Sequence, residues 1–365
     1  MSSPKEPENK TKTSPLLWLH MGQMLSSIKN QEDVLPAVKG LQAYLKAQVP
    51  ARVDGKLFWQ EGEVSLRVYE PEKQNKYPPV IFIPSIINRS TLFDLHPQKS
   101  LLRWFLAKGF KVYQLDWGTP VNDSGLSDMA ALVHTRLIPA FDAVYAQEKR
   151  KLSLVNYCLG GLLALPLAAE RQDLIARMAF LATPWDFSIP HDEIAERART
   201  QKGTIAQLVN EQGKVPFSFL QMFFMGGGEN IYLKKFSLLD KSPKGIQAEI
   251  FVALENWVND RVDMPGPLAL EVVTEFYENN KTMYGTWQVG DKSVNAAALH
   301  IPSLIIAPMQ DKIVIPRSAA ALGHMMPQAT IYKPFCGHTG LVAGRRAERT
   351  IWPRLTRFFA TQTDI

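Results

Sequence analysis

The fold is decided by residues 152–161, which read LSLVNYCLGG. The first six residues are typical of a buried strand, and the apolar run that follows predicts a helix over residues 160–170. A sharp turn between a strand and a helix lifts one side chain above the edge of a sheet, as in the nucleophile elbow. Cys158 occupies the nucleophile position of this turn, and a helix N-terminus favours the thiolate form of a cysteine. We therefore expect a nucleophilic cysteine, with a small buried cysteine as the alternative interpretation.

Further strands and helices alternate on both sides of this turn. Apolar runs predict strands at residues 79–84, 111–116, 177–181, 303–307 and 330–332. Helical spacing predicts helices at residues 100–108, 129–148, 318–326 and 346–360. Residues 56–69 have the pattern of a β-hairpin. Strands separated by helices of this length indicate a mostly parallel sheet with crossover helices.

The alternation stops between residues 186 and 298, where the chain is helical and aromatic. An α/β sheet that is interrupted and later completed is one domain with an insertion. We therefore predict a core at residues 56–185 and 299–365 and a helical cap or lid at residues 186–298. Residues 1–14 have the composition of a disordered tail. Residues 15–55 form an N-terminal helical segment, in which Pro36 predicts a break between two helices.

A nucleophilic cysteine needs a base, and the base needs a group that orients it. His338 follows the last predicted strand, and Asp311 follows the strand before it. The chain order Cys158, Asp311, His338 is nucleophile, acid, base, which is the order of the α/β-hydrolase fold. None of the other six histidines has a matching acid at a strand end. Cys336 is interpreted as a packed loop thiol.

An acyl-transfer site also needs donors for the oxyanion of the tetrahedral intermediate. In this fold they are the backbone N–H of the residue after the nucleophile and one from the loop after the first buried strand. The expected donors are therefore Leu159 together with Ile86 or Ile87.

Composition excludes several other classes of protein. The 365 residues include only two cysteines, so a disulfide scaffold is excluded, and no cluster has metal-ligand spacing. The net charge of +6 is spread along the chain, which does not indicate nucleic-acid binding. Neither a signal peptide nor a membrane-spanning run is visible, so a soluble, intracellular protein is expected.

Several separated stretches resemble the polyhydroxyalkanoate (PHA) synthases, nearest the compact catalytic subunits of class III. The resemblance covers roughly residues 55–360. The similar stretches are residues 84–89 (PSIINR), 93–97 (FDLHP), 109–120 (GFKVYQLDWGTP), 256–260 (NWVND), 276–281 (FYENNK), 311–316 (DKIVIP) and Gly337-His338.

The resemblance implies an acyltransferase that polymerises 3-hydroxyacyl groups from CoA thioesters into polyester and releases CoA. Cys158 would carry the acyl group as a thioester, His338 would activate Cys158, and Asp311 would orient His338. The resemblance implies no metal and no cofactor apart from the CoA thioester substrate. As partners it implies the growing polyester and its granule surface, a second synthase subunit and a homodimer, with a cytoplasmic location at the granules.

Two residues depart from the family pattern. Asn156 stands where the family has Gly or Ser, and Lys312 stands where it often has His. These departures keep open the alternative of a thioesterase or esterase of the α/β-hydrolase fold. The mildly basic charge and the N-terminal helical residues 14–47 keep open a second one, a non-catalytic granule-associated homologue.

Overall fold

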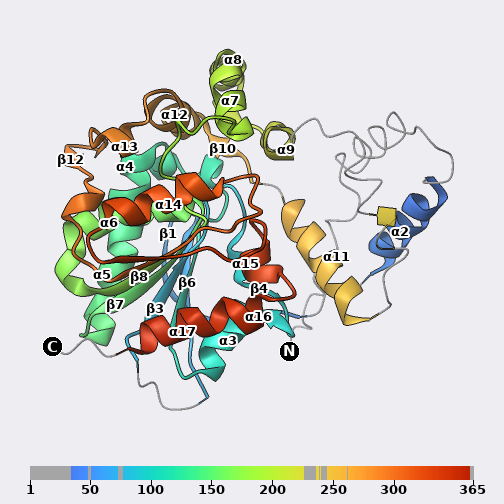
Figure 1. Ribbon diagram of the computed structural model, residues 1–365, viewed down its shortest axis with the longest axis horizontal. Coiled ribbons are helices and arrows are strands. Elements are labelled where there is room, and N and C mark those ends of the chain that lie inside the picture. Colours follow the sequence, from blue (N-terminus) through green and yellow to red (C-terminus); the bar gives the residue numbers. More distant parts are fainter. Residues whose placement is uncertain are drawn as a thin grey trace, which may run out of the picture.

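The computed structural model describes residues 34–47, 51–72, 77–225, 236–237, 239, 245–260 and 262–361. Within these residues the centre is an eight-stranded sheet of order β1-β2-β6-β3-β7-β8-β13-β14 (Figure 1). Its strands are β1 (Lys56–Glu61), β2 (Val64–Tyr69), β3 (Val80–Ile83), β6 (Val112–Asp116), β7 (Leu152–Tyr157), β8 (Ile175–Leu181), β13 (Ser303–Ile306) and β14 (Ala329–Tyr332). The β1–β2 and β2–β6 pairs are antiparallel, and the remaining neighbours are parallel.

This sheet confirms the predicted α/β-hydrolase fold, including the hairpin formed by β1 and β2. The central strands β3, β7 and β13 are buried along their whole length. They are buried on both faces because helices cover the sheet on both sides, and this explains their continuous apolar sequences.

Helices surround the sheet (Figure 1). The longer helices of the core are α3 (Leu101–Ala107), α5 (Ile138–Glu148), α6 (Leu159–Arg171), α14 (Pro316–Met325) and α17 (Trp352–Ala360). Helices α3 and α17 are far apart in the sequence but pack together through aromatic rings. The ring centroids of Trp104 and Trp352 lie 5.8 Å apart, and those of Phe105 and Phe359 lie 6.0 Å apart.

Short elements complete the core. They are η3 (Ser90–Phe93), β4 (Asp94–His96), β5 (Lys99–Ser100), η4 (Pro120–Asn122), η5 (Ser124–Leu126), α4 (Met129–Leu132), the π-helical η6 (Val133–Leu137), η7 (Gln172–Leu174), α15 (Gly340–Ala343) and α16 (Ala347–Thr350). The single helix predicted at residues 346–360 is wrong, because α16 and α17 are separate helices. Pro353 is the reason: it lacks an N–H and is accommodated in the first turn of α17.

The described residues of 186–298 are mainly helical. Helices α7, α8 and α12 lie over one end of the sheet, at the top of Figure 1, whereas α11 lies beside the core. The elements are α7 (Glu193–Thr200), α8 (Lys202–Gln212), β9 (Lys214–Val215), α9 (Phe217–Met225), α11 (Ile246–Val258), β10 (Met264–Pro265), α12 (Gly266–Glu271), the π-helical η8 (Val272–Glu278), α13 (Lys281–Tyr284), β11 (Gln288–Val289), β12 (Lys292–Ser293) and η9 (Ala296–Ala298). Two short antiparallel pairs, β9–β10 and β11–β12, interrupt the helices. The proposed limits of the cap stay predictions.

The N-terminal segment is described from residue 34, where α2 (Val34–Lys46) begins. The predicted tail and first helix lie outside the described residues. Within the described residues, α2 runs through Pro36 without a break. Helix α2 packs against α11: Leu41 and Tyr44 share an apolar cluster with Val252, and the Tyr44 hydroxyl donates to Asn256 Oδ1 at 2.6 Å.

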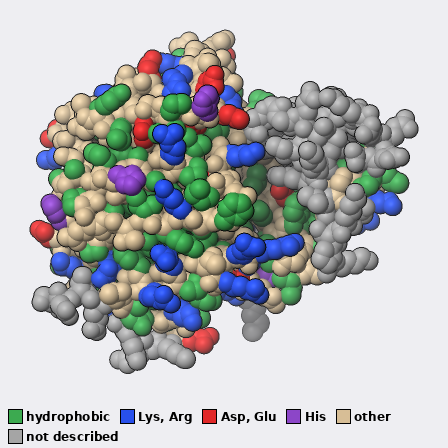
Figure 2. Space-filling model, in the orientation of Figure 1, with side chains coloured by type: hydrophobic (Ala, Val, Ile, Leu, Met, Phe, Trp, Pro, Cys, Tyr) green, Lys and Arg blue, Asp and Glu red, His purple; other side chains and the backbone are tan. Residues whose placement is uncertain are grey.

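No helix in the described ranges is long and apolar enough to cross a membrane. On the face drawn in Figure 2, Lys and Arg side chains lie in several separate groups among apolar and uncharged ones.

Candidate active site

The turn between β7 and α6 has the backbone of a nucleophile elbow. Cys158 has backbone angles of φ 53° and ψ −126°, which residues other than glycine rarely adopt. Such a conformation costs on the order of 1–3 kcal/mol and persists only where neighbouring structure holds it. Here the Cys158 N–H donates to the Leu181 carbonyl of β8 at 2.9 Å, and the Cys158 carbonyl accepts from Gly161 N–H at 2.9 Å.

Two glycines allow α6 to start close to the sheet. A Cβ atom at Gly160 would lie 2.5 Å from the carbonyl oxygens of Ile83 and Pro84, and one at Gly161 would lie 2.0 Å from Thr183 Oγ1. Because backbone carbonyls cannot move without distorting β3 and its loop, position 160 requires glycine. The two glycines therefore allow the helix and the strands to approach closely.

Asp311 and His338 meet above the carboxyl ends of β13 and β14. Asp311 is buried, and its Oδ1 accepts from the N–H groups of Ile313 and Val314 at 2.8 and 3.0 Å. Its Oδ2 lies 2.7 Å from His338 Nδ1. With both oxygens engaged, the carboxylate is held in one orientation and orients the imidazole.

His338 and Cys158 line the same cavity, and the sulfur is close enough to affect the pKa of the imidazole. Burial alone would lower the pKa of His338, but the negative charges of Asp311 and Cys158 and the hydrogen bond to Asp311 outweigh it and raise this pKa to about 10. The structure therefore brings the three predicted residues together, with the histidine in the middle. Such an arrangement can hold an imidazolium beside a thiolate.

Tyr157 and Cys336 are neighbours of these three residues. The ring of Tyr157 lies 5.1 Å from the imidazole of His338, centroid to centroid, and its hydroxyl is buried without a partner. Cys336 is partly buried, and desolvation together with Asp311 raises the pKa of its thiol to about 11. Cys336 is therefore held as a thiol, in line with its interpretation as a loop residue.

The predicted oxyanion donors lie beside Cys158. Leu159 and Ile87 line the same cavity as the thiol, and Ile86 is buried next to Ile87. In the described part of the chain, the N–H groups of these three residues donate to no other backbone carbonyl. Their role as oxyanion donors stays a prediction.

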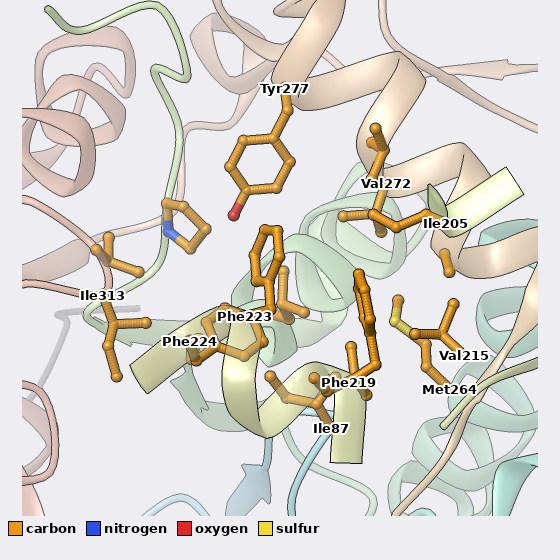
Figure 3. Close-up of a pocket in the computed structure, with 17 residues that line it drawn as sticks. Ile87, Ile205, Val215, Phe219, Phe223, Phe224, Met264, Val272, Tyr277 and Ile313 are labelled. Carbon is orange, nitrogen blue, oxygen red and sulfur yellow. The ribbon is translucent and has the colours of Figure 1, made fainter. Parts of the chain in front are cut away.

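Cys158 lines two cavities. The first, which we call the apolar cavity, contains about 640 Å³ of space including its open mouth (Figure 3). It is lined by Ile87, Cys158, Leu159, Pro184, Ile205, Val215, Phe219, Leu220, Phe223, Phe224, Met264, Ala269, Val272, Val273, Tyr277, Ile313 and Val314. Residues of the predicted cap supply most of these walls.

The second cavity, which we call the histidine cavity, lies on the His338 side of the same thiol. It is lined by Ser85, Ile87, Asn88, Tyr157, Cys158, Phe217, Leu220, Gln221, Phe224, Trp257, Val258, Ile313, His338 and Thr339. The thiol is thus reachable from an almost wholly apolar space and from one that carries several polar groups.

Two site residues were not singled out from the sequence. Ser85 lines the histidine cavity with its hydroxyl buried and unpartnered, and Tyr277 lines the apolar cavity. Both belong to stretches that carry the family resemblance, which was the available signal. Trp257 comes from a third such stretch: its indole N–H donates to the Arg89 carbonyl at 2.8 Å and fixes one wall of the histidine cavity.

The other described histidines do not form a second site. His96 lies 2.9 Å from Glu249, and His134 lies 2.8 Å from Glu170, both glutamates being on helices. Among residues that the structure describes, no group of three or more His, Cys, Asp or Glu side chains could hold a metal ion.

Comparison with solved structures supports the class of fold. MenH from S. aureus is similar with a TM-score of 0.50 and 14% identity, over 80% of this chain and 97% of that chain. With the sheet order and the elbow described above, the chain has the α/β-hydrolase fold.

Comparison of sequences supports the particular relationship. Residues 15–105 match the family model described as the poly-beta-hydroxybutyrate polymerase (PhaC) N-terminus. The poly(3-hydroxyalkanoate) polymerase subunit PhaC of Allochromatium vinosum is 24% identical over 93% of this chain and 93% of its own length. The protein of the same name from Haloferax mediterranei is 23% identical over 86% of this chain, which spans 65% of that relative. The predicted resemblance to the PHA synthases is confirmed.

We predict that Gly160→Ala lowers the free energy of unfolding by about 1–3 kcal/mol, because the new methyl group overpacks against the backbone of residues 83–84. Gly203→Ala is the matched control, since a Cβ there has no neighbour within 4 Å. It should leave stability unchanged or raise it by up to about 1 kcal/mol. Urea unfolding of both variants measures the difference, and equal stabilities would contradict the proposed close approach.

We also predict a pH dependence of stability from His338. Its pKa is about 10 in the folded chain against 6.5 in the unfolded chain, so its contribution is complete below pH 6.5 and is lost as pH rises towards 10. Asp311→Asn keeps an oxygen for the Ile313 and Val314 amides but removes the charge, so it should lower this pKa. The stability advantage of wild type over Asp311→Asn should therefore shrink between pH 6.5 and 10 in urea unfolding.

The control for this experiment is the exposed carboxylate Asp291, whose change to Asn should show no such trend. An advantage of wild type over Asp311→Asn that stays constant across the range would show that the carboxylate does not raise the pKa of His338.

Proposed function

We propose that this chain is a PHA synthase-like acyltransferase that polymerises 3-hydroxyacyl groups from CoA thioesters. The observation that carries the proposal is the line Cys158–His338–Asp311, in which His338 is hydrogen-bonded to Asp311 and shares a cavity with Cys158, at the point where two cavities meet. Relatives whose printed name is poly(3-hydroxyalkanoate) polymerase support the choice of substrate.

In the first step, the Cys158 sulfur attacks the carbonyl carbon of the CoA thioester. A bond forms between this carbon and Cys158, the bond to the CoA sulfur breaks, and the Cys158 proton held by His338 passes to the departing thiolate. The amides of Leu159 and of Ile86 or Ile87 would hold the oxyanion. The raised pKa of His338 suits this step, because the imidazolium can both stabilise the thiolate and donate the proton.

In the second step, the 3-hydroxyl of another unit attacks the thioester on Cys158. The new ester bond forms as the carbon–sulfur bond breaks, and the hydroxyl proton passes through His338 to the released thiolate. One thiol then needs room for two acyl groups at once, and the two cavities on either side of Cys158 offer that room. The apolar walls also exclude water, which would otherwise hydrolyse the thioester.

The partners follow from this proposal. The substrate would be a 3-hydroxyacyl-CoA, and the steps above use no metal and no further cofactor. A second synthase subunit, a homodimer, the growing polyester and its granule surface are the proposed partners, with a cytoplasmic location at the granules.

We predict that Cys158→Ala abolishes both CoA release and formation of an acyl-enzyme from 3-hydroxybutyryl-CoA. Cys336→Ala is the matched control and should retain most activity, because Cys336 is not part of the Cys158–His338–Asp311 line. Intact-protein mass spectrometry detects the acyl-enzyme, and a thiol reagent measures CoA. Retention of an acyl adduct in Cys158→Ala would remove Cys158 from the proposed role.

We predict insoluble polyester, and not free 3-hydroxybutyrate, as the product of the purified protein with this substrate. The competing hypothesis of a thioesterase rests on Asn156, which stands at a position where the family has a small residue, Gly or Ser. In the structure its Nδ2 donates to the Ala179 carbonyl at 3.1 Å, and the strand register around it is preserved. Product analysis, with and without a candidate second subunit, separates the two: CoA and free acid in equal amounts without polymer would favour hydrolysis.

A further inference from the structure

Tyr277 is the one polar side chain besides Cys158 that faces the apolar cavity. The remaining residues that line this cavity have hydrocarbon or thioether side chains. Figure 3 shows the tyrosine ring entering from η8, with its hydroxyl oxygen pointing into the space near Phe223 and Phe224. Within the described residues, this hydroxyl has neither a hydrogen bond nor a charged partner in contact.

The ring of Tyr277 is held in place from behind. It packs edge-on against Phe187 with centroids 4.9 Å apart. Arg199 Nη1 donates to the carbonyls of both Phe187 and Tyr277 at 3.2 Å, which joins their two backbones. The π-helical turn that carries Tyr277 also changes the direction of its side chain relative to an α-helix, a feature often found at functional sites. The hydroxyl is therefore pre-positioned in the cavity.

The hydroxyl is also kept as a donor. Desolvation, followed by the charges of Asp192 and Cys158, raises the pKa of Tyr277 well above its ordinary value. A neutral phenol placed in an apolar space needs an acceptor, because a polar group without one loses the hydrogen bonds it had in water.

A 3-hydroxyacyl group has two oxygens to satisfy. Its carbonyl oxygen is accounted for by the amides beside Cys158, under the proposed function on which this inference rests. Its 3-hydroxyl would be stranded among apolar side chains unless it met a polar group. We infer that the Tyr277 hydroxyl binds the 3-hydroxyl of the acyl group on Cys158 and thereby selects 3-hydroxyacyl over unsubstituted acyl thioesters.

The rival location for the 3-hydroxyl is the histidine cavity, where the buried hydroxyl of Ser85 has no partner. The two locations predict different variants to lose selectivity. A site built to hydrogen-bond a substrate hydroxyl discriminates against the analogue that lacks it, because its own polar group is then left unpaired.

The test compares acylation of Cys158 by 3-hydroxybutyryl-CoA and by butyryl-CoA, which differ only in this hydroxyl. Intact-protein mass spectrometry under single-turnover conditions gives the rate with each thioester for the full chain. The preference of wild type for the hydroxylated substrate should fall by about 3- to 10-fold in Tyr277→Phe, the equivalent of one neutral hydrogen bond. The rate with butyryl-CoA should be retained, which a merely structural defect would not do.

Two controls accompany this variant. Tyr284→Phe removes the hydroxyl of an exposed tyrosine seven residues later and should keep the wild-type preference, whereas Ser85→Ala tests the rival location. An unchanged preference in Tyr277→Phe, no preference in wild type, or a loss confined to Ser85→Ala would each overturn the inference. If wild type forms no acyl-enzyme with either thioester, the proposed function itself fails, and the inference fails with it.

Discussion

The active site depends on the backbone at Cys158, which is forced into a conformation that a side chain normally avoids. The turn is held because β8 accepts its N–H, and because α6 starts within contact of β3 and Thr183. Without the Gly160–Gly161 pair the helix would have to move away from the sheet. The thiol would then no longer lie between its two cavities or within reach of His338. The strain at one residue is thus maintained by the packing of three strands and a helix.

This constraint also explains how Asn156 is tolerated. Its side chain is fully buried, and its amide donates to the neighbouring strand while Oδ1 remains without a partner. An unsatisfied buried oxygen is unfavourable, but the ladders on both sides of β7 are regular around Asn156, the one with β8 from Ser153 to Tyr157. Asn156, which departs from the family pattern two residues before the nucleophile, is therefore accommodated without disturbing the strand pairing around it.

The sequence was sufficient to predict the strand positions, the fold and the meeting of Cys158, Asp311 and His338, because parallel strands bring their carboxyl ends to one edge. The sequence did not predict the direction in which individual side chains point. Tyr277 points into a cavity because a π-helical turn changes its direction, and apolar periodicity does not distinguish a π turn from an α turn. The break at Ile351 was missed because Pro353 is compatible both with the start of a new helix and with a kink in a continuous one.

Helix α11 has two neighbours that belong to different parts of the chain. Asn256 accepts the hydrogen bond from Tyr44 of the N-terminal segment, and the next residue, Trp257, forms a wall of the histidine cavity. Helix α2, which precedes the sheet in the sequence, is therefore connected through α11 to a wall of the histidine cavity. A change in α2 therefore alters the support of a helix that forms part of this wall.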